Sequence, residues 1–129
     1  MRAVDTNILA RYIVGDDPDQ SPRATAVLAT PCFVSDTVLL ETAWLLSSRF
    51  DFDRADLAAT LQDIIQLPSL TVSDRIMMRW AIERFAAGAD FADMMHLVGA
   101  RHADVFISFE TRLKAQAGPD TPIEIEQPA

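Results

Sequence analysis

Four acidic residues follow short apolar runs or lie near expected helix starts, and their type and placement suggest a cation site. They are Asp5, Glu41, Asp93 and Glu110. The dipole at a helix start favours a negative charge, and hard cations such as Mg²⁺ prefer several oxygen ligands. Carboxylates only a few ångströms apart raise one another's pKa values unless a cation neutralises them. Mg²⁺ or Mn²⁺ in such a cluster would activate a water for phosphodiester hydrolysis.

The elements that must position these acids are strand-to-helix units. Asp5 follows the apolar pair Ala3-Val4 and precedes a helix to about Tyr12, for which Thr6 or Asn7 is the expected cap. Because ligands of open parallel sheets bind beyond the carboxyl ends of the strands, Asp5 is expected at the functional edge. Further strands are predicted over 31–35, 70–72, 104–108 and 123–125, and helices over 22–29, 36–46, 54–65, 77–85, 91–102 and 109–114.

The helix positions of the later acids leave a choice between structural and functional roles. Glu41 interrupts an otherwise apolar helix, where a carboxylate is costly to bury without a partner, although a solvent-facing position explains it equally well. Asp90 and Asp93 are three residues apart and share a helix face. Asp90 is the expected helix cap, which leaves Asp93 as the better candidate for chemistry. Ser21, followed by Pro22, is the expected cap of the second helix.

The bulk composition predicts one globular domain over residues 1–129. The chain is 50% hydrophobic and 23% charged, and its single cysteine, Cys32, is expected to be a buried apolar residue in a reducing compartment. No signal peptide or membrane span is evident, so a cytoplasmic protein is expected. A net charge of −8 argues against binding nucleic acid by bulk electrostatics. A bound cation would instead present positive charge to a phosphate.

Four segments together resemble a PIN-domain ribonuclease, of the type found as the VapC toxin of toxin–antitoxin pairs. They are Val4-Asp5-Thr6-Asn7-Ile8-Leu9, the run from Ser35 to Glu41, Asp90-Phe91-Ala92-Asp93-Met94-Met95-His96, and Phe106-Ile107-Ser108-Phe109-Glu110. The order, the spacing and the chain length fit this family. The resemblance implies a three-layer α/β fold, with a central, mostly parallel sheet of about four to five short strands flanked by helices.

By this resemblance, Asp5, Glu41 and Asp93 bind Mg²⁺ or Mn²⁺, and Thr6 or Asn7 orients Asp5 or a metal-bound water. Asp90 and Ser108 are supporting residues. The last strand of the family usually ends in Thr-x-Asp, whereas this chain has Ser108-Phe109-Glu110. Serine keeps the hydroxyl and glutamate keeps the charge of this fourth ligand, on a side chain one methylene longer.

The resemblance also implies an RNA substrate, a cognate antitoxin and a homodimer. Two other interpretations stay open: a PIN-like binding protein with weakened catalysis, for which Glu110 is the hint, and a receiver-like phosphoacceptor domain. The latter would need a lysine directly after its last sheet strand, where this chain has Ser108-Phe109-Glu110. His96 and His102 are expected to be structural or surface residues, because oxygen suits Mg²⁺ better than nitrogen.

Overall fold

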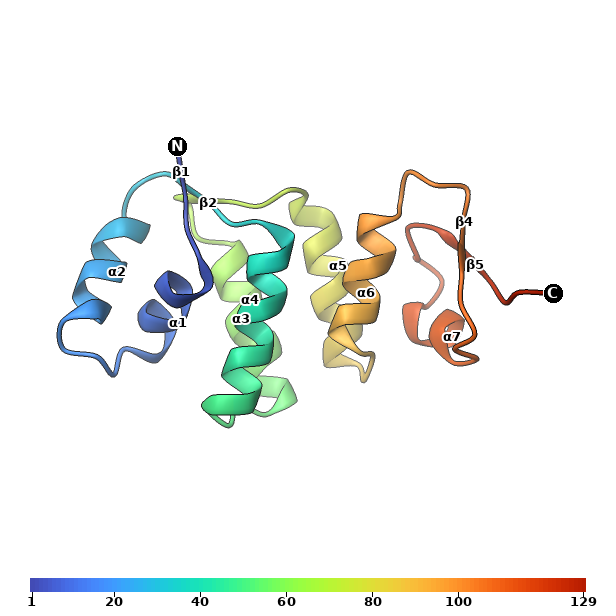
Figure 1. Cartoon of the computed structure of the whole chain (residues 1–129), viewed down its shortest axis with the longest axis horizontal. Coiled ribbons are helices and arrows are strands. Elements are labelled where there is room, and N and C mark those ends of the chain that lie inside the picture. The colour runs from blue at the N-terminus through green and yellow to red at the C-terminus, as the bar shows by residue number, and fades with distance from the viewer. The chain divides into compact units, whose positions relative to one another are not determined.

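A computed structural model describes residues 1–129. The chain consists of two compact units, Met1–Arg75 and Ile76–Ala129. In Figure 1 the first unit runs from blue to yellow-green and the second from yellow to red. The elements of the first unit are, in order, β1 (Arg2–Ala3), α1 (Thr6–Val14), α2 (Gln20–Leu28), β2 (Cys32–Phe33), α3 (Asp36–Arg49), α4 (Arg54–Ile65) and β3 (Leu70–Thr71). Those that follow are α5 (Arg75–Ala86), α6 (Phe91–Gly99), β4 (Val105–Ile107), α7 (Leu113–Ala117) and β5 (Glu124–Glu126).

The first unit is built on a three-stranded parallel sheet in the order β1-β2-β3. Ala3 lies opposite Phe33, and Phe33 lies opposite Thr71. Parallel neighbours need long crossover connections, and here each crossover is a pair of helices, α1 with α2 and then α3 with α4. Helix α1 packs against α2 and α3, and α3 packs against α4 (Figure 1). The predicted α/β fold with short parallel strands is therefore confirmed.

The core of the first unit comes from the apolar faces of these helices and from the middle of the sheet. Leu9, Leu46 and Leu61 are fully buried, as is Cys32 on the central strand. Cys32 is thus the small buried residue that its sequence context predicts. No helix of the chain combines the length and the apolar character needed to span a membrane.

The second unit pairs β4 with β5 in parallel, with Phe106 opposite Ile125. Helices α5 and α6 form a hairpin, in which the rings of Phe85 and Phe91 have centroids 5.7 Å apart. Arg84 of α5 donates from Nε to the carbonyl oxygen of Gln116 at 2.7 Å. This bond ties the last turn of α7 to α5, because a cation at a helix C-terminus satisfies carbonyls that have no partner in the helix.

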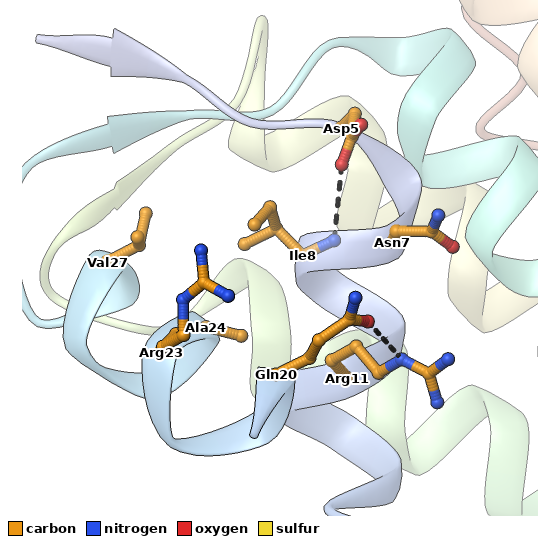
Figure 2. Close-up of a pocket in the computed structure, with 8 residues that line it drawn as sticks. All are labelled: Asp5, Asn7, Ile8, Arg11, Gln20, Arg23, Ala24 and Val27. Carbon is orange, nitrogen blue, oxygen red and sulfur yellow. Dashed lines mark hydrogen bonds between the residues drawn. The ribbon is translucent and has the colours of Figure 1, made fainter. Parts of the chain in front are cut away.

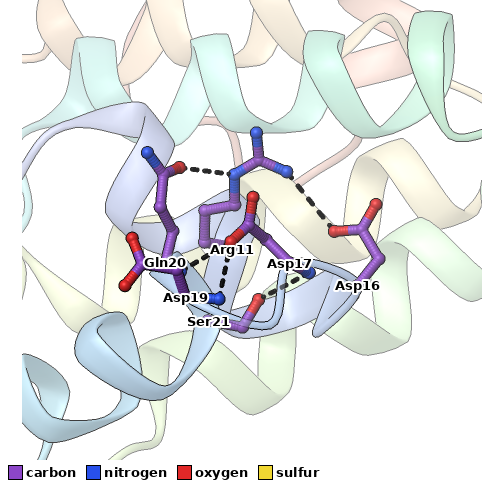
Figure 3. A network of polar contacts seen from close by, with 6 residues as sticks. All are labelled: Arg11, Asp16, Asp17, Asp19, Gln20 and Ser21. Carbon is purple, nitrogen blue, oxygen red and sulfur yellow. Dashed lines mark hydrogen bonds and ion pairs between the residues drawn. The ribbon is translucent and has the colours of Figure 1, made fainter.

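The start of α2 differs from the prediction, because the helix begins at Gln20, directly after Asp19, and the side chain that accepts N–H groups at its start is Asp17 rather than Ser21 (Figure 3). The Asp17 carboxylate accepts hydrogen bonds from the backbone N–H of Asp19 at 2.9 Å and of Gln20 at 2.6 Å. In return, the Ser21 hydroxyl accepts the N–H of Asp17 at 3.2 Å. The N–H groups of Gln20 and then Asp19 lower the pKa of Asp17. Ser21, the predicted cap, instead lies within the first turn of α2, where its hydroxyl accepts from the turn that precedes the helix.

Two other predictions from the sequence need correction. Asp5, rather than Thr6 or Asn7, caps α1, and Gly15 ends that helix with the positive φ of 68° that glycine adopts without strain. The short helix predicted over 109–114 begins later, at Leu113, so that Glu110 lies in a turn between β4 and α7. Asp90 caps α6 as predicted, and Ser35 and Asp53 cap α3 and α4.

The Asp53 cap gives a direct test of how α4 is stabilised. Its carboxylate accepts the backbone N–H of Asp56 at 2.8 Å, so Asp53→Ala is expected to lower the free energy of unfolding by about 1 kcal/mol. Asp63→Ala is the matched control, since it removes a negative charge near the C-terminal end of the same helix and is expected to be neutral or slightly stabilising. Urea denaturation measures both, and equal losses in the two variants would contradict the assignment.

Candidate functional site

The carboxylate of Asp5 lies at the junction of β1 and α1. Its backbone is extended, with φ −96° and ψ 179°, and its Oδ1 accepts the N–H of Ile8 at 3.2 Å (Figure 2). Asp5 itself is exposed. This capping hydrogen bond fixes the Asp5 side chain at the turn between β1 and α1, and it uses only one of the two carboxylate oxygens. The other oxygen is available to a ligand such as a cation.

Glu41 reaches the same place from α3. The hydroxyl of Thr6, a residue only 8% exposed, donates a short hydrogen bond to Oε1 of Glu41. Glu41 itself is exposed, and it lines a cavity of about 330 Å³ together with Asp5, Thr6 and Asn7. The structure thus brings together the four residues of the first unit that the sequence singles out.

A second cavity of about 270 Å³ opens on the other side of Asp5, between α1 and α2 (Figure 2). Asp5 and Asn7 line it together with Arg11 and Arg23. The Arg11 guanidinium donates from Nε to the side chain of Gln20 at 2.9 Å and forms an ion pair with Asp16 at 3.4 Å (Figure 3). Two arginines therefore line the same cavity as Asp5, in a protein whose net charge is −8.

In the second unit, Asp90 and Asp93 occupy the first turn of α6. Asp90 is the cap, and its Oδ1 accepts the N–H of Asp93 at 2.9 Å. Partial burial raises the pKa of Asp93, and the negative charges of Asp90 and Glu110 raise it further, while the nearby His96 opposes them. Asp93 therefore belongs to a group of acids whose mutual repulsion a bound cation would relieve.

Glu110 is held in the turn after β4 by two local hydrogen bonds. Its backbone N–H donates to the Ser108 hydroxyl at 3.0 Å, and its Oε1 accepts the N–H of Arg112 at 3.1 Å. The serine of the Ser-x-Glu sequence thus shapes the turn that carries the carboxylate. His96 and His102 are both exposed, as predicted for residues outside a core, and His96 lies on the same face of α6 as Asp93.

Within neither unit do three or more histidine, cysteine or acidic residues gather closely enough to enclose a metal ion. The pair in the first unit nevertheless fits Mg²⁺, which is usually bound through one or two carboxylates and keeps several waters and substrate oxygens as its other ligands. Asp5 and Glu41 are such a pair on one cavity wall. Their donor set is oxygen only, which favours Mg²⁺ or Mn²⁺ over softer metals.

Three more residues line the cavity of Asp5 and Glu41, namely Trp44, Leu45 and Arg49, and sequence reasoning did not assign them to the site. A signal for them was present, because Trp44 follows Glu41 by three residues and therefore shares its helix face. Arg49 follows Leu45, another residue of that face, by four. The apolar positions of α3 hid this signal, because they cover most faces of the helix.

The PIN domain family matches residues 2–119 of the chain. The protein therefore belongs to the PIN-domain family, whose members generally are nucleases that use divalent metal ions. This assignment confirms the family predicted from the four sequence segments. A comparison with curated proteins gives no match.

The raised pKa of Asp93 predicts an unusual effect of neutralising it. A raised pKa means that the charged form disfavours folding, so the stability that Asp93 contributes is complete below the ordinary aspartate pKa of 3.8 and is lost as the pH rises through the raised pKa. In metal-free protein, Asp93→Asn should therefore raise the midpoint of urea denaturation at pH 7, and the gain should vanish at low pH.

The matched control is Asp56→Asn, which changes an exposed acid in the first turn of α4. Removing a negative charge there should lower the midpoint slightly, because the helix dipole favours it. A lower midpoint for Asp93→Asn at every pH would show that the carboxylate is stabilising and that its burial has no cost.

Proposed function

We propose that this PIN-domain protein is a divalent-metal-dependent endoribonuclease. The observation that carries the proposal is the juxtaposition of Asp5 and Glu41 in one cavity, with Thr6 donating to Glu41. The family contributes the chemical class, since PIN domains are generally metal-dependent nucleases. We further propose that residues 1–129 act as a single PIN domain.

The residues proposed to hold Mg²⁺ or Mn²⁺ are Asp5 and Glu41 in the first unit and Asp93 and Glu110 in the second. When bound, the ion would supply an activated water and positive charge opposite the leaving oxygen of a phosphodiester. Thr6 holds the Glu41 carboxylate in place by its hydrogen bond. In the second unit, Asp90 fixes the first turn of α6, and Ser108 fixes the turn that carries Glu110.

RNA as substrate is supported by where the positive charge lies rather than by its amount. The net charge of −8 would repel a polyanion, but Arg11, Arg23 and Arg49 line the two cavities that share Asp5. Guanidinium groups suit phosphate oxygens, because their planar donors can form paired hydrogen bonds. The family membership favours this hydrolytic function over the receiver-like alternative.

Purified protein is expected to cleave single-stranded RNA with Mg²⁺ or Mn²⁺ and to lose this activity when a chelator is added. Asp5→Asn, Glu41→Gln and Asp93→Asn should each reduce the rate by about 100-fold or more, because each removes a proposed ligand charge while keeping the shape of the side chain. Gel analysis of a labelled RNA measures the rates, and Asp56→Asn serves as the control for the loss of one exposed acid.

Equal cleavage by the parent and all three variants would indicate a contaminating nuclease. A folded parent without any metal-dependent cleavage would favour the alternative of a binding protein with weakened catalysis, for which the replacement of the family's aspartate by Glu110 is the specific observation.

The finer biological role that we propose is that of a cytoplasmic toxin, homodimeric and paired with a cognate antitoxin. Induced expression of the chain in a bacterial host is expected to arrest growth, because uncontrolled RNA cleavage halts translation. Asp93→Asn, expressed to the same level, should permit growth, as should co-expression of the small protein encoded beside the chain. Growth that is unaffected by the folded, active parent would contradict the toxin role while leaving the nuclease activity intact.

A further inference from the structure

Trp44 is a large aromatic residue whose side chain is exposed to water, although apolar side chains of this size are usually buried. It belongs to α3, whose core-facing residues include the fully buried Leu46, yet 64% of Trp44 is exposed. Its neighbours in the cavity are mostly polar: the carboxylates of Asp5 and Glu41, the amide of Asn7 and the guanidinium of Arg49. An exposed indole beside charged groups is a surface to which a flat ligand with charged ends can bind.

The order of these groups along α3 follows from helix geometry. With a rise of 1.5 Å per residue, the indole of Trp44 is attached roughly 4.5 Å beyond Glu41, and Arg49 a further 7.5 Å or so towards the helix end. Glu41, Trp44 and Leu45 share one face, and Arg49 continues it one turn after Leu45. The aromatic ring therefore stands between a pair of acids and a cation.

We infer that this face of α3 is a nucleotide subsite, in which one base of single-stranded RNA stacks on Trp44 and the neighbouring phosphate contacts Arg49. Every base has a π face, so stacking on an exposed aromatic residue binds single strands with little sequence preference. The guanidinium of Arg49 supplies the charge that a phosphate requires. The inference rests on the proposed ribonuclease function, since it places the bound strand across the acids of the same cavity.

The cavity favours a nucleotide over an apolar protein segment. A helix or a second copy that covered Trp44 with apolar side chains would also cover the two carboxylates and the guanidinium, and burying such groups without partners is costly. A nucleotide offers a flat apolar face to the indole and an anion to Arg49, and it leaves the carboxylates free to hold a cation. The exposed aromatic face and the cation are therefore complementary to the base and the phosphate of a nucleotide.

The test measures binding without cleavage, so that it does not depend on catalysis. Single-stranded oligoadenylate is titrated into the full chain in the presence of a chelator, and affinity is followed by anisotropy of a label on the RNA. Trp44→Ala is expected to weaken binding by about 5- to 100-fold, whereas Trp44→Phe keeps an aromatic face and should stay within about threefold of the parent. Ile76→Ala is the control, because Ile76 is a large apolar residue 71% exposed outside the cavity.

Two further measurements distinguish base stacking on Trp44 from a nonspecific loss of contact area in Trp44→Ala. Stacking should quench the emission of the exposed Trp44, while the second tryptophan, Trp80, is only 8% exposed, so the quenching should disappear in Trp44→Phe. On an oligomer of the same length without bases, Trp44→Ala and the parent should bind equally, since no base remains to stack. Both variants are expected to fold, because the ring contributes little to the core.

Arg49→Gln should weaken binding to all single strands and reduce the slope of log affinity against log salt by about 0.7, the value for one phosphate contact. Arg54→Gln makes the same change of charge at an exposed position outside the cavity and should leave the slope unchanged. These results would support the subsite even if no RNA cleavage were found.

Unchanged affinity and unchanged quenching in the Trp44 variants would overturn the inference, even if Asp5→Asn abolishes cleavage. So would a Trp44→Ala variant that binds RNA normally but has lost a dimer in light scattering, because Trp44 would then be the contact with a second copy. The proposed ribonuclease function would survive either result.

Discussion

The hydrogen bond from Thr6 to Glu41 is the constraint on which the geometry of the first unit's site depends. It connects the first turn of α1 to the second turn of α3, two helices that pack together. Thr6 is buried, so its hydroxyl needs a partner, while Glu41 interrupts an apolar helix and gains a donor. One contact thus gives the buried Thr6 hydroxyl a partner, and it holds the exposed Glu41 carboxylate in the cavity lined by Asp5.

The acids at the starts of α1 and α6 differ in the structural roles of their carboxylates. Asp5 and Asp90 each accept a backbone N–H at the start of a helix, where ionised carboxylates are stabilised. Asp93 lies one turn further along, where its partial burial and then the nearby like charges raise its pKa. The helix starts therefore hold the ionised carboxylates of Asp5 and Asp90 without an energetic penalty. The penalty for ionisation falls on Asp93, which is not a cap.

Charge in this molecule is organised locally and not over the whole surface. The acidic chain carries arginines on both sides of Asp5, with Arg11 held by Gln20 and Asp16 and Arg49 at the end of α3. Fixing the Arg11 guanidinium reduces the conformational entropy that it would lose on binding an anion. Such an arrangement suits a polyanionic substrate, because the arginines attract the polyanion at the site and the acidic surface repels it elsewhere.

The sequence by itself determined the order of the strands and helices and the cap at Asp90. These features depend on hydrogen bonds between residues within about one helical turn, so a short stretch of sequence contains them. It did not determine which residue caps α1 or α2, since several neighbouring polar residues competed locally. Only the tertiary structure decided that Thr6 meets Glu41 and that Trp44 lines their cavity, because those contacts follow from how α1 and α3 pack, and packing depends on the side-chain volumes of the whole core.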